Sequence, residues 1–287
     1  MPPTKVHITE TARDAMQGIT TFIPTNDKVN YINALLKVGF DVVDCGSYVS
    51  PKVIPQMADS DSVIRQLQLP EKKPEIMALV VNETGVRKAS ENDRINCLSY
   101  PFSVSPTFLK RNLNISTIDS LALIDRMQHQ TALKSINWVI YLSMGFGNPY
   151  GDDWSSGLVI DLAAILYEKG FTRLPLSDIL GEANPDTIYA TYQSLCKALP
   201  QVDFGLHLHT KPSESFRKLE AAWEAGVRSF ETVVNGLGGC PTAADEMVGN
   251  LSTQNLLHFL SEKNALPQLN FNAINEAGAI AGNFSQS

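Results

Sequence analysis

Two histidines in one short apolar run are the residues of this sequence best suited to chemistry. His207 and His209 lie in the segment Gly205-Leu206-His207-Leu208-His209-Thr210, which has the apolar character of a strand. Residues two apart in a strand face the same side, so both imidazoles would point one way, with Cα atoms roughly 6.5–7 Å apart. That spacing suits two imidazoles that bind one metal ion. An isolated His-x-His pair is more often packed core, so other polar residues must decide between the two interpretations.

The composition is that of an ordinary globular protein. The chain has 287 residues, a formal net charge of −7 and 44% hydrophobic residues, which allows one large domain or two small ones. The four cysteines include no Cys-x-x-Cys pair, which favours a reducing compartment, and we expect cytoplasmic localisation. Neither a signal peptide nor a membrane-spanning apolar run is apparent, and the mild acidity argues against nucleic acid as a partner.

Short apolar runs alternate with helical periods eight times along the chain. The expected strands are Val6–Glu10, Phe40–Asp44, Glu75–Val81, Ile95–Tyr100, Ile136–Ser143, Phe171–Leu176, Val202–His209 and Arg228–Val233. The expected helices are Asn26–Val38, Asp61–Leu67, Glu83–Ser90, Thr117–Leu133, Ser155–Lys169, Asp186–Leu199, Ser213–Ala225 and Thr253–Lys263, and a last helix lies near Phe271–Gly282.

Eight strand–helix units predict an α/β fold of the (β/α)₈ TIM-barrel type, as one domain over residues 1–287 with a C-terminal helix after the eighth unit. A doubly wound open sheet is the alternative. It is less favoured, because no Gly-x-Gly-x-x-Gly turn follows the first strand.

A barrel would bring four polar side chains together. Active sites of this fold lie at the carboxyl ends of the strands, and strands seven, eight and one are neighbours in a closed barrel. Asp14 follows the first strand, His207 and His209 end the seventh, and Asn250 follows the eighth. Two imidazoles, one carboxylate and one amide suit Mg²⁺ or Mn²⁺ better than a thiolate-rich zinc site would. Singly, each could be structural: Asp14 as a helix cap, and Asn250 as the cap of a helix starting near Ser252.

Two further residues near this point could act on a substrate. Arg13 could hold a carboxylate or stabilise a developing enolate oxygen, or it could form a rim ion pair with Glu10 or Asp44. Cys240 lies in the segment Gly236-Leu237-Gly238-Gly239-Cys240-Pro241, whose glycines allow positive φ and movement. We interpret the thiol as a general acid on a closing loop, although buried free cysteines are common.

Longer motifs of the chain resemble the 3-hydroxy-3-methylglutaryl-CoA lyase family, within the metal-dependent TIM-barrel lyases and condensing enzymes. The likeness runs nearly end to end. The motifs are Glu10-x-x-Arg13-Asp14-x-x-Gln17, Ser47-Tyr48-Val49-Ser50-Pro51-Lys52-x-x-Pro55-Gln56-Met57-x-Asp59, Lys110-Arg111-Asn112-x-Asn114, His207-x-His209, and Gly236-Leu237-Gly238-Gly239-Cys240-Pro241 followed by Gly249-Asn250-Leu251.

The resemblance implies a role for each candidate residue. A divalent cation, Mg²⁺ or Mn²⁺, would be held by Asp14, His207, His209 and Asn250. Arg13 would stabilise the enolate of the departing acetyl-CoA, and Cys240 would protonate it. Asp44 falls where the family has a catalytic glutamate. The general base stays open among Asp14, Asp44 and a histidine such as His207.

The activity that the resemblance implies is retro-Claisen cleavage of hydroxymethylglutaryl-CoA, in a protein that is commonly a homodimer. A lyase for a related 3-hydroxyacyl-CoA, or a condensing synthase of the isopropylmalate or citramalate kind, is the alternative. The CoA thioester is the expected small-molecule partner, and Lys52, Lys110 and Arg111 could meet its phosphates or be ordinary surface charge. Four departures from the family pattern leave the metal set intact but bear on substrate identity: Ala15, Asp44, Thr210, and a stretch between Cys240 and Asn250 that is longer by about one residue.

Overall fold

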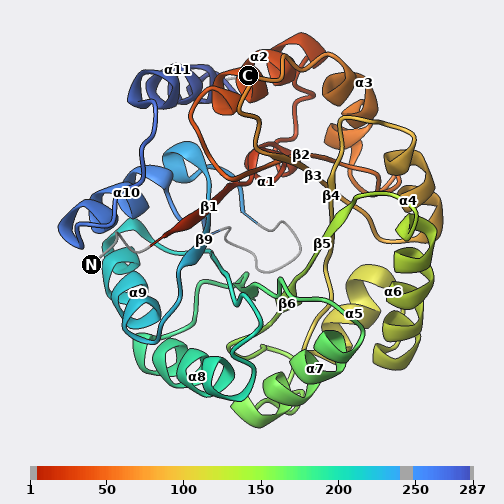
Figure 1. The fold of residues 1–287 in the computed structure, drawn as a ribbon, viewed down its shortest axis with the longest axis vertical. Helices are drawn as coiled ribbons and strands as arrows, with labels where there is room; N and C mark the ends of the chain where they lie inside the picture. Colours follow the sequence, from red (N-terminus) through yellow and green to blue (C-terminus); the bar gives the residue numbers. More distant parts are fainter. Residues whose placement is uncertain (1–4, 240–247, 285–287) are drawn as a thin grey trace.

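The computed structural model describes residues 5–239 and 248–284. Within these residues, parallel strands form one sheet in the order β5-β4-β3-β2-β1-β9-β8-β7-β6. The strands are β1 (His7–Glu10), β2 (Val42–Ser47), β3 (Glu75–Leu79), β4 (Cys97–Tyr100), β5 (Asn137–Ile140), β6 (Leu142–Ser143), β7 (Leu176–Asp178), β8 (Leu206–Leu208) and β9 (Ser229–Thr232). Figure 1 shows the strands at the centre of the molecule with the helices arranged around them.

The barrel closes at Tyr141, which separates β5 from β6. β5 pairs with β4, and β6 pairs with β7. The amide of Tyr141 donates to the carbonyl of Tyr100 at 3.0 Å, whereas the amide of Leu142 donates to the carbonyl of Pro175 at 2.8 Å. Ile140 also donates to the carbonyl of Arg173, and Ser143 to that of Phe102, so amides of both short strands alternate between the two neighbours. β5 and β6 therefore fill one position of the barrel. The predicted (β/α)₈ TIM barrel is confirmed, with the expected strand Ile136–Ser143 divided in two.

Helices form the outer layer. They are α1 (Ala12–Gln17), α2 (Thr25–Leu36), α3 (Ser60–Arg65), α4 (Glu83–Ser90), α5 (Pro106–Leu113), α6 (Thr117–Thr131), α7 (Ser156–Glu168), α8 (Pro185–Ala198), α9 (Pro212–Glu224), α10 (Thr253–Glu262) and α11 (Phe271–Gly282), with short 3₁₀ turns η1 (Pro55–Met57) and η2 (Val234–Gly236). The expected C-terminal helix α11 has the predicted bounds and lies beside α2 (Figure 1), where the rings of Tyr31 and Phe284 meet edge to face at 5.4 Å. In the described part of the chain, no helix is both long and apolar enough to cross a membrane.

Two strands were expected too early in the chain. The sixth was expected over Phe171–Leu176, but the regular strand begins at Leu176, and before it Arg173 forms only an isolated bridge with Asp203. Pro175, between the two, has no amide hydrogen for a ladder bond. The seventh was expected over Val202–His209, and the regular strand is only Leu206–Leu208. His209 lies just beyond it and forms an isolated antiparallel bridge with Asn250. These shifts bring polar residues to the carboxyl ends of β7 and β8.

Two helices near those strand ends were not expected from periodicity. α1 begins directly after β1 and carries Arg13 and Asp14 in its first turn. α5 is capped by Ser105, whose hydroxyl accepts a hydrogen bond from the amide of Phe108 at 3.0 Å, and Pro106 occupies the first turn. Both helices border the cavity described next.

Candidate active site

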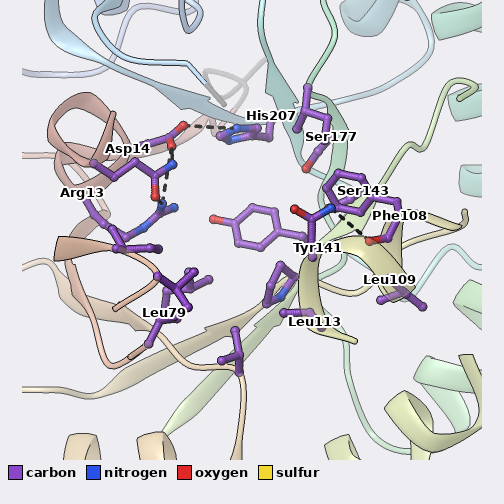
Figure 2. A pocket seen from close by; sticks show the side chains of 18 of the residues that line it. Arg13, Asp14, Leu79, Phe108, Leu109, Leu113, Tyr141, Ser143, Ser177 and His207 are labelled. Atoms are coloured by element: carbon purple, nitrogen blue, oxygen red, sulfur yellow. Dashed lines mark hydrogen bonds and ion pairs between the residues drawn. The ribbon is translucent and has the colours of Figure 1, made fainter. Parts of the chain in front are cut away.

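A cavity of about 260 Å³ opens at the carboxyl ends of the strands. Its charged lining residues gather around the predicted metal ligands, and its remaining walls are mostly apolar side chains, with a few neutral polar groups such as Ser143 and Ser177 (Figure 2). The lining residues are Arg13, Asp14, Gln17, Val49, Val53, Ile54, Pro55, Leu79, Val81, Pro101, Phe108, Leu109, Asn112, Leu113, Tyr141, Ser143, Ser177, Ile179, His207 and His209. A largely apolar cavity with a few convergent polar groups is the usual form of a small-molecule site.

Asp14, His207 and His209 meet at one side of this cavity. One ligand atom from each lies within 4.8 Å of the others, and all three residues are buried. Oδ2 of Asp14 is 3.7 Å from Nε2 of each histidine, and the two Nε2 atoms are 3.3 Å apart. The sequence prediction that these three residues converge is therefore correct. A carboxylate oxygen and two imidazole nitrogens at this spacing fit a divalent cation.

Asp14 is held so that one oxygen stays directed at the histidines. It is not a helix cap but lies inside α1, where Arg13 Nη1 and Gln17 Nε2 both donate to its Oδ1. Oδ2 is left facing His207 and His209. Burial alone would raise the pKa of Asp14, but hydrogen bonding from His209 and the charge of Arg13 together lower it below its usual range. The carboxylate is therefore ionised and ready to bind a cation.

His207 is oriented by a residue that sequence reasoning missed. Its Nδ1 lies 2.8 Å from Oε2 of Glu231, which comes from the neighbouring strand β9. The hydroxyl of Tyr141 donates to the same carboxylate oxygen at 2.9 Å. Burial lowers the pKa of His207, but the hydrogen bond and charge of Glu231 raise it more, so the net shift is upward.

The backbones of His209 and Asn250 are paired with each other. Besides the bridge between them, the amide of Leu251 donates to the carbonyl of Leu208 at 2.8 Å, which fixes this segment against β8. Asn250 is 5% exposed, and its Nδ2 donates to the carbonyl of Leu237 at 2.8 Å. It is not the cap of the eighth helix, the structural alternative considered for it, because α10 begins at Thr253 with Ser252 as its N-cap. Asn250 as a fourth ligand stays a prediction.

Arg13 pairs with Asp44, one of the two ion-pair partners considered for it. Arg13 Nε lies 2.7 Å from Oδ2 of Asp44, and Arg13 Nη1 also donates to Gln17 Oε1 at 2.7 Å. Glu10 instead accepts hydrogen bonds from the amide of Val234 and from hydroxyls of the eighth unit. The guanidinium is thus fixed in place while it lines the cavity.

Asp44 is fully buried beneath Arg13. It is absent from the described lining of the cavity, and its Oδ1 has no hydrogen-bond partner among residues 5–239 and 248–284. Burial raises the pKa of Asp44 to about 6, although the neighbouring charge of Arg13 opposes the shift. Its observed contact is with Arg13, and a role as general base stays a prediction.

The comparisons with known proteins identify the family of this chain. A family model described as HMGL-like matches residues 5–280. The chain belongs to the HMGL-like family. Hydroxymethylglutaryl-CoA lyase YngG of Bacillus subtilis is 32% identical over 261 residues, which cover 91% of this chain and 86% of that protein.

Solved structures of relatives have the same fold as this HMGL-like chain. The HMG-CoA lyase of Bacillus subtilis superposes with a TM-score of 0.91 at 30% identity, covering 99% of this chain and 96% of that one. An HMG-CoA lyase from Acinetobacter baumannii, solved in complex with coenzyme A and 3-methylmalate, has a TM-score of 0.87 at 27% identity, covering 97% and 92% of the two chains. The resemblance to the HMG-CoA lyases that the motifs indicated is therefore confirmed.

The cationic residues predicted to contact CoA lie on the surface of this HMGL-like barrel. Lys52, Lys110 and Arg111 are exposed, and none lines the cavity as the described residues form it. Arg111 packs over the ring of Tyr150, 4.7 Å from its centroid. Their contact with CoA phosphates stays a prediction.

Cys240 lies outside the described residues, so its predicted role is untested by the structure. The loop that leads to it is described as far as Gly239. Gly236, Gly238 and Gly239 have φ values of +64°, +80° and +140°, which favour glycine, as the sequence predicted. A Cβ at Gly238 would overlap the backbone carbonyl oxygen of Asp14, so this glycine also permits a close approach to the proposed metal ligand.

Proposed function

We infer that this protein is a carbon–carbon lyase that cleaves 3-hydroxy-3-methylglutaryl-CoA to acetoacetate and acetyl-CoA with a divalent cation. One observation carries the inference: the buried cluster of Asp14, His207 and His209 lines the same cavity as Arg13, in a chain of the HMGL-like family. Relatives that cover most of the chain are named hydroxymethylglutaryl-CoA lyases. The complex of one relative with coenzyme A supports an acyl-CoA substrate.

We propose that Mg²⁺ or Mn²⁺ is held by Asp14, His207, His209 and Asn250. The first three supply converging ligand atoms, and the bridge to His209 brings the backbone of Asn250 beside them. When bound, the cation would polarise the substrate 3-hydroxyl and an adjacent oxygen, which lowers the pKa of the hydroxyl.

Cleavage then needs a base and a site for negative charge. The base, which we leave open among Asp14, Asp44 and His207, takes the proton of the 3-hydroxyl. The C2–C3 bond breaks, C3 becomes the keto carbon of acetoacetate, and the bonding electron pair passes to C2 and the thioester as an enolate. Arg13 would stabilise the enolate oxygen, because its guanidinium lines the cavity and is already fixed by Asp44 and Gln17. Cys240 would give its thiol proton to C2, which completes acetyl-CoA.

The other lining groups suit the rest of the substrate. The side chains of Asn112, Ser143 and Ser177 line the cavity and offer neutral hydrogen-bonding groups to acyl oxygens. Apolar walls exclude water from the reacting atoms. Two lining residues each follow a cationic residue in the chain: Asn112 follows Arg111, and Val53 follows Lys52. These cations therefore lie near the cavity, and we propose that they contact the CoA phosphates.

The experiment that tests the function is release of acetyl-CoA from a panel of 3-hydroxyacyl-CoA thioesters, with and without Mg²⁺ or Mn²⁺. We expect cation-dependent release from hydroxymethylglutaryl-CoA. Faster turnover of another 3-hydroxyacyl-CoA would change the substrate. Consumption of acetyl-CoA with a 2-oxo acid, and no cleavage of any thioester, would favour a condensing synthase of the isopropylmalate or citramalate type.

We also propose that residues 1–287 form one barrel domain, and that the protein is a cytoplasmic homodimer. The absence of a Cys-x-x-Cys pair from the sequence supports a reducing compartment. Light scattering on the purified protein measures the oligomeric state directly.

A further inference from the structure

The environment of His207 contains a carboxylate that the proposed mechanism does not use. Ser143, Ser177, His207 and Glu231 are successive register partners across β6, β7, β8 and β9. Register partners of neighbouring strands point to the same face of a sheet, so this row of side chains faces one side together. Glu231 is only 7% exposed, yet its carboxylate has no cationic side chain within salt-bridge distance except His207, among the described residues.

The hydrogen bonds of Glu231 distinguish the two nitrogens of the His207 ring. Oε2 also accepts from the hydroxyl of Tyr141, and a carboxylate oxygen that accepts from Nδ1 over the contact of 2.8 Å places the ring proton on Nδ1. A neutral imidazole then has its lone pair on Nε2. That atom is the one directed at Oδ2 of Asp14 and at Nε2 of His209.

The second histidine of the cluster has no such partner. Nδ1 of His209 is buried and makes no hydrogen bond within the described part of the chain. The two imidazoles are therefore unequal: one is oriented by a carboxylate and the other by packing and its backbone bridge. Metal-ligating histidines commonly donate their second ring N–H to a carboxylate, which fixes the tautomer and makes the ligand nitrogen more basic.

Tyr141 supplies the second donor to Glu231. Its hydroxyl donates to the same Oε2 at 2.9 Å, and its ring meets the His207 ring edge to face at 5.7 Å between centroids. Figure 2 shows Tyr141 reaching between the side that carries Arg13 and Asp14 and the side that carries Ser177. Oε2 of this buried carboxylate therefore has two partners, Tyr141 and His207, and only His207 belongs to the metal cluster.

We propose that Glu231 is the positioning residue of this centre: its carboxylate holds His207 as the Nδ1–H tautomer and directs Nε2 at the cation. This inference deepens the proposed function and rests on its metal centre, but not on the identity of the acyl-CoA. Glu231 acts through His207 and touches neither the substrate nor the cation.

The test is a set of substitutions read out by metal affinity. Glu231→Ala removes the acceptor, Glu231→Gln keeps the shape without the charge, and Glu231→Asp keeps the carboxylate on a shorter side chain. The dissociation constant for Mn²⁺ alone is measured by calorimetry on folded, metal-stripped protein. Loss of such a partner typically weakens metal binding about 10–100-fold, and we expect that loss in Glu231→Ala, with smaller losses in the other two variants.

Two matched controls separate positioning from general disruption. Tyr141→Phe removes the other hydrogen bond to Glu231 Oε2 and should change the Mn²⁺ dissociation constant by less than about threefold. Glu10→Gln alters a second buried glutamate, on the adjacent strand β1, whose hydrogen bonds go to Val234, Thr232 and Thr253. It should leave Mn²⁺ affinity unchanged.

The tautomer gives an independent readout. Nitrogen-15 NMR of the metal-free protein should show the proton of His207 on Nδ1, and Glu231→Ala should shift it toward Nε2. If Glu231→Ala unfolds, the isosteric Glu231→Gln carries the test alone. Wild-type affinity and tautomer in the folded Glu231 variants would overturn the proposal, and so would equal losses in Tyr141→Phe. If the protein shows no lyase activity but its Mn²⁺ affinity still depends on Glu231, the proposed substrate would be overturned and this inference supported.

Discussion

Removal of the Arg13 side chain should damage both stability and catalysis, and the structure allows the two effects to be separated. Nε of Arg13 lies 2.7 Å from Oδ2 of Asp44, and the two side chains are almost completely buried. Breaking a buried ion pair by deleting one partner typically destabilises the folded protein by about 3–5 kcal/mol. Asp44 already has one unpartnered oxygen among the described residues, so Arg13→Ala would leave its whole carboxylate without a partner. A loss of activity in Arg13→Ala alone therefore proves little.

The informative comparison includes Asp44→Asn and the double variant. Asp44→Asn removes the buried charge but leaves Arg13 hydrogen-bonded to Gln17 and beside Asp14. We expect it to lower kcat by no more than about tenfold, the size of one ordinary hydrogen bond. The double variant leaves no unpaired carboxylate at Asp44, so it should regain most of the stability lost in Arg13→Ala. Its kcat should still be about 10²–10³-fold below that of Asp44→Asn, because the enolate has lost a fixed positive charge.

The measurements are urea unfolding and steady-state release of acetyl-CoA from hydroxymethylglutaryl-CoA at saturating cation. A double variant whose kcat equals that of Asp44→Asn would refute the reasoning, because Arg13 would then be only the structural partner of Asp44. A loss in Asp44→Asn as large as in Arg13→Ala would instead support Asp44 as the general base.

Three further predictions concern His207, Cys240 and Glu10. His207→Ala should abolish binding of Mn²⁺ and activity while thermal unfolding shows a folded barrel, and a cation that binds this variant normally would move the metal site elsewhere. Cys240→Ser should keep cation and substrate binding but lower kcat about 10²–10⁴-fold. Full activity of this variant would exclude the thiol as proton donor. In the wild type, a bound dicarboxylate analogue should protect the thiol from alkylation. Burial raises the pKa of Glu10 from 4.5 to about 8, so its contribution to stability is complete below about pH 4.5 and is lost as pH rises through about 8. Urea unfolding between pH 5 and 8 should therefore show a steeper loss of stability in the wild type than in Glu10→Gln, and parallel curves would contradict the shift.

The barrel and the convergence of Asp14, His207 and His209 could be predicted because their signals are local. Each strand–helix unit shows its own apolar period, and eight such units allow few other folds. His207 and His209 share a face by the two-residue period of a strand, and Asp14 follows β1 directly. Where these local rules had an exception, the prediction failed: Pro175 delays the sixth strand, because it cannot donate a ladder hydrogen bond.

The contacts made by Glu231 depend on information that the sequence does not display. Glu231 lies inside the expected strand Arg228–Val233 and is one of many acidic side chains in the chain. Its partner His207 is 24 positions away, and only the pairing of β8 with β9 brings the two side chains together. α5 is a different case, because Ser105 and Pro106 form a recognisable helix start that periodicity alone overlooked.

The glycine loop shows how one residue type can satisfy two physical requirements. The sequence predicted that Gly236, Gly238 and Gly239 allow positive φ and movement of the segment before Cys240. At Gly238 the φ of +80° agrees, but any Cβ there would also meet the carbonyl oxygen of Asp14 and approach within 3.0 Å of the Cα of Ala15. The root of the loop is therefore packed against α1, the helix that presents Arg13 and Asp14 to the cavity. A side chain at Gly238 would displace either the loop or the proposed metal ligand Asp14. The loop that leads to the proposed proton donor Cys240 is therefore joined to the metal centre by one close backbone contact.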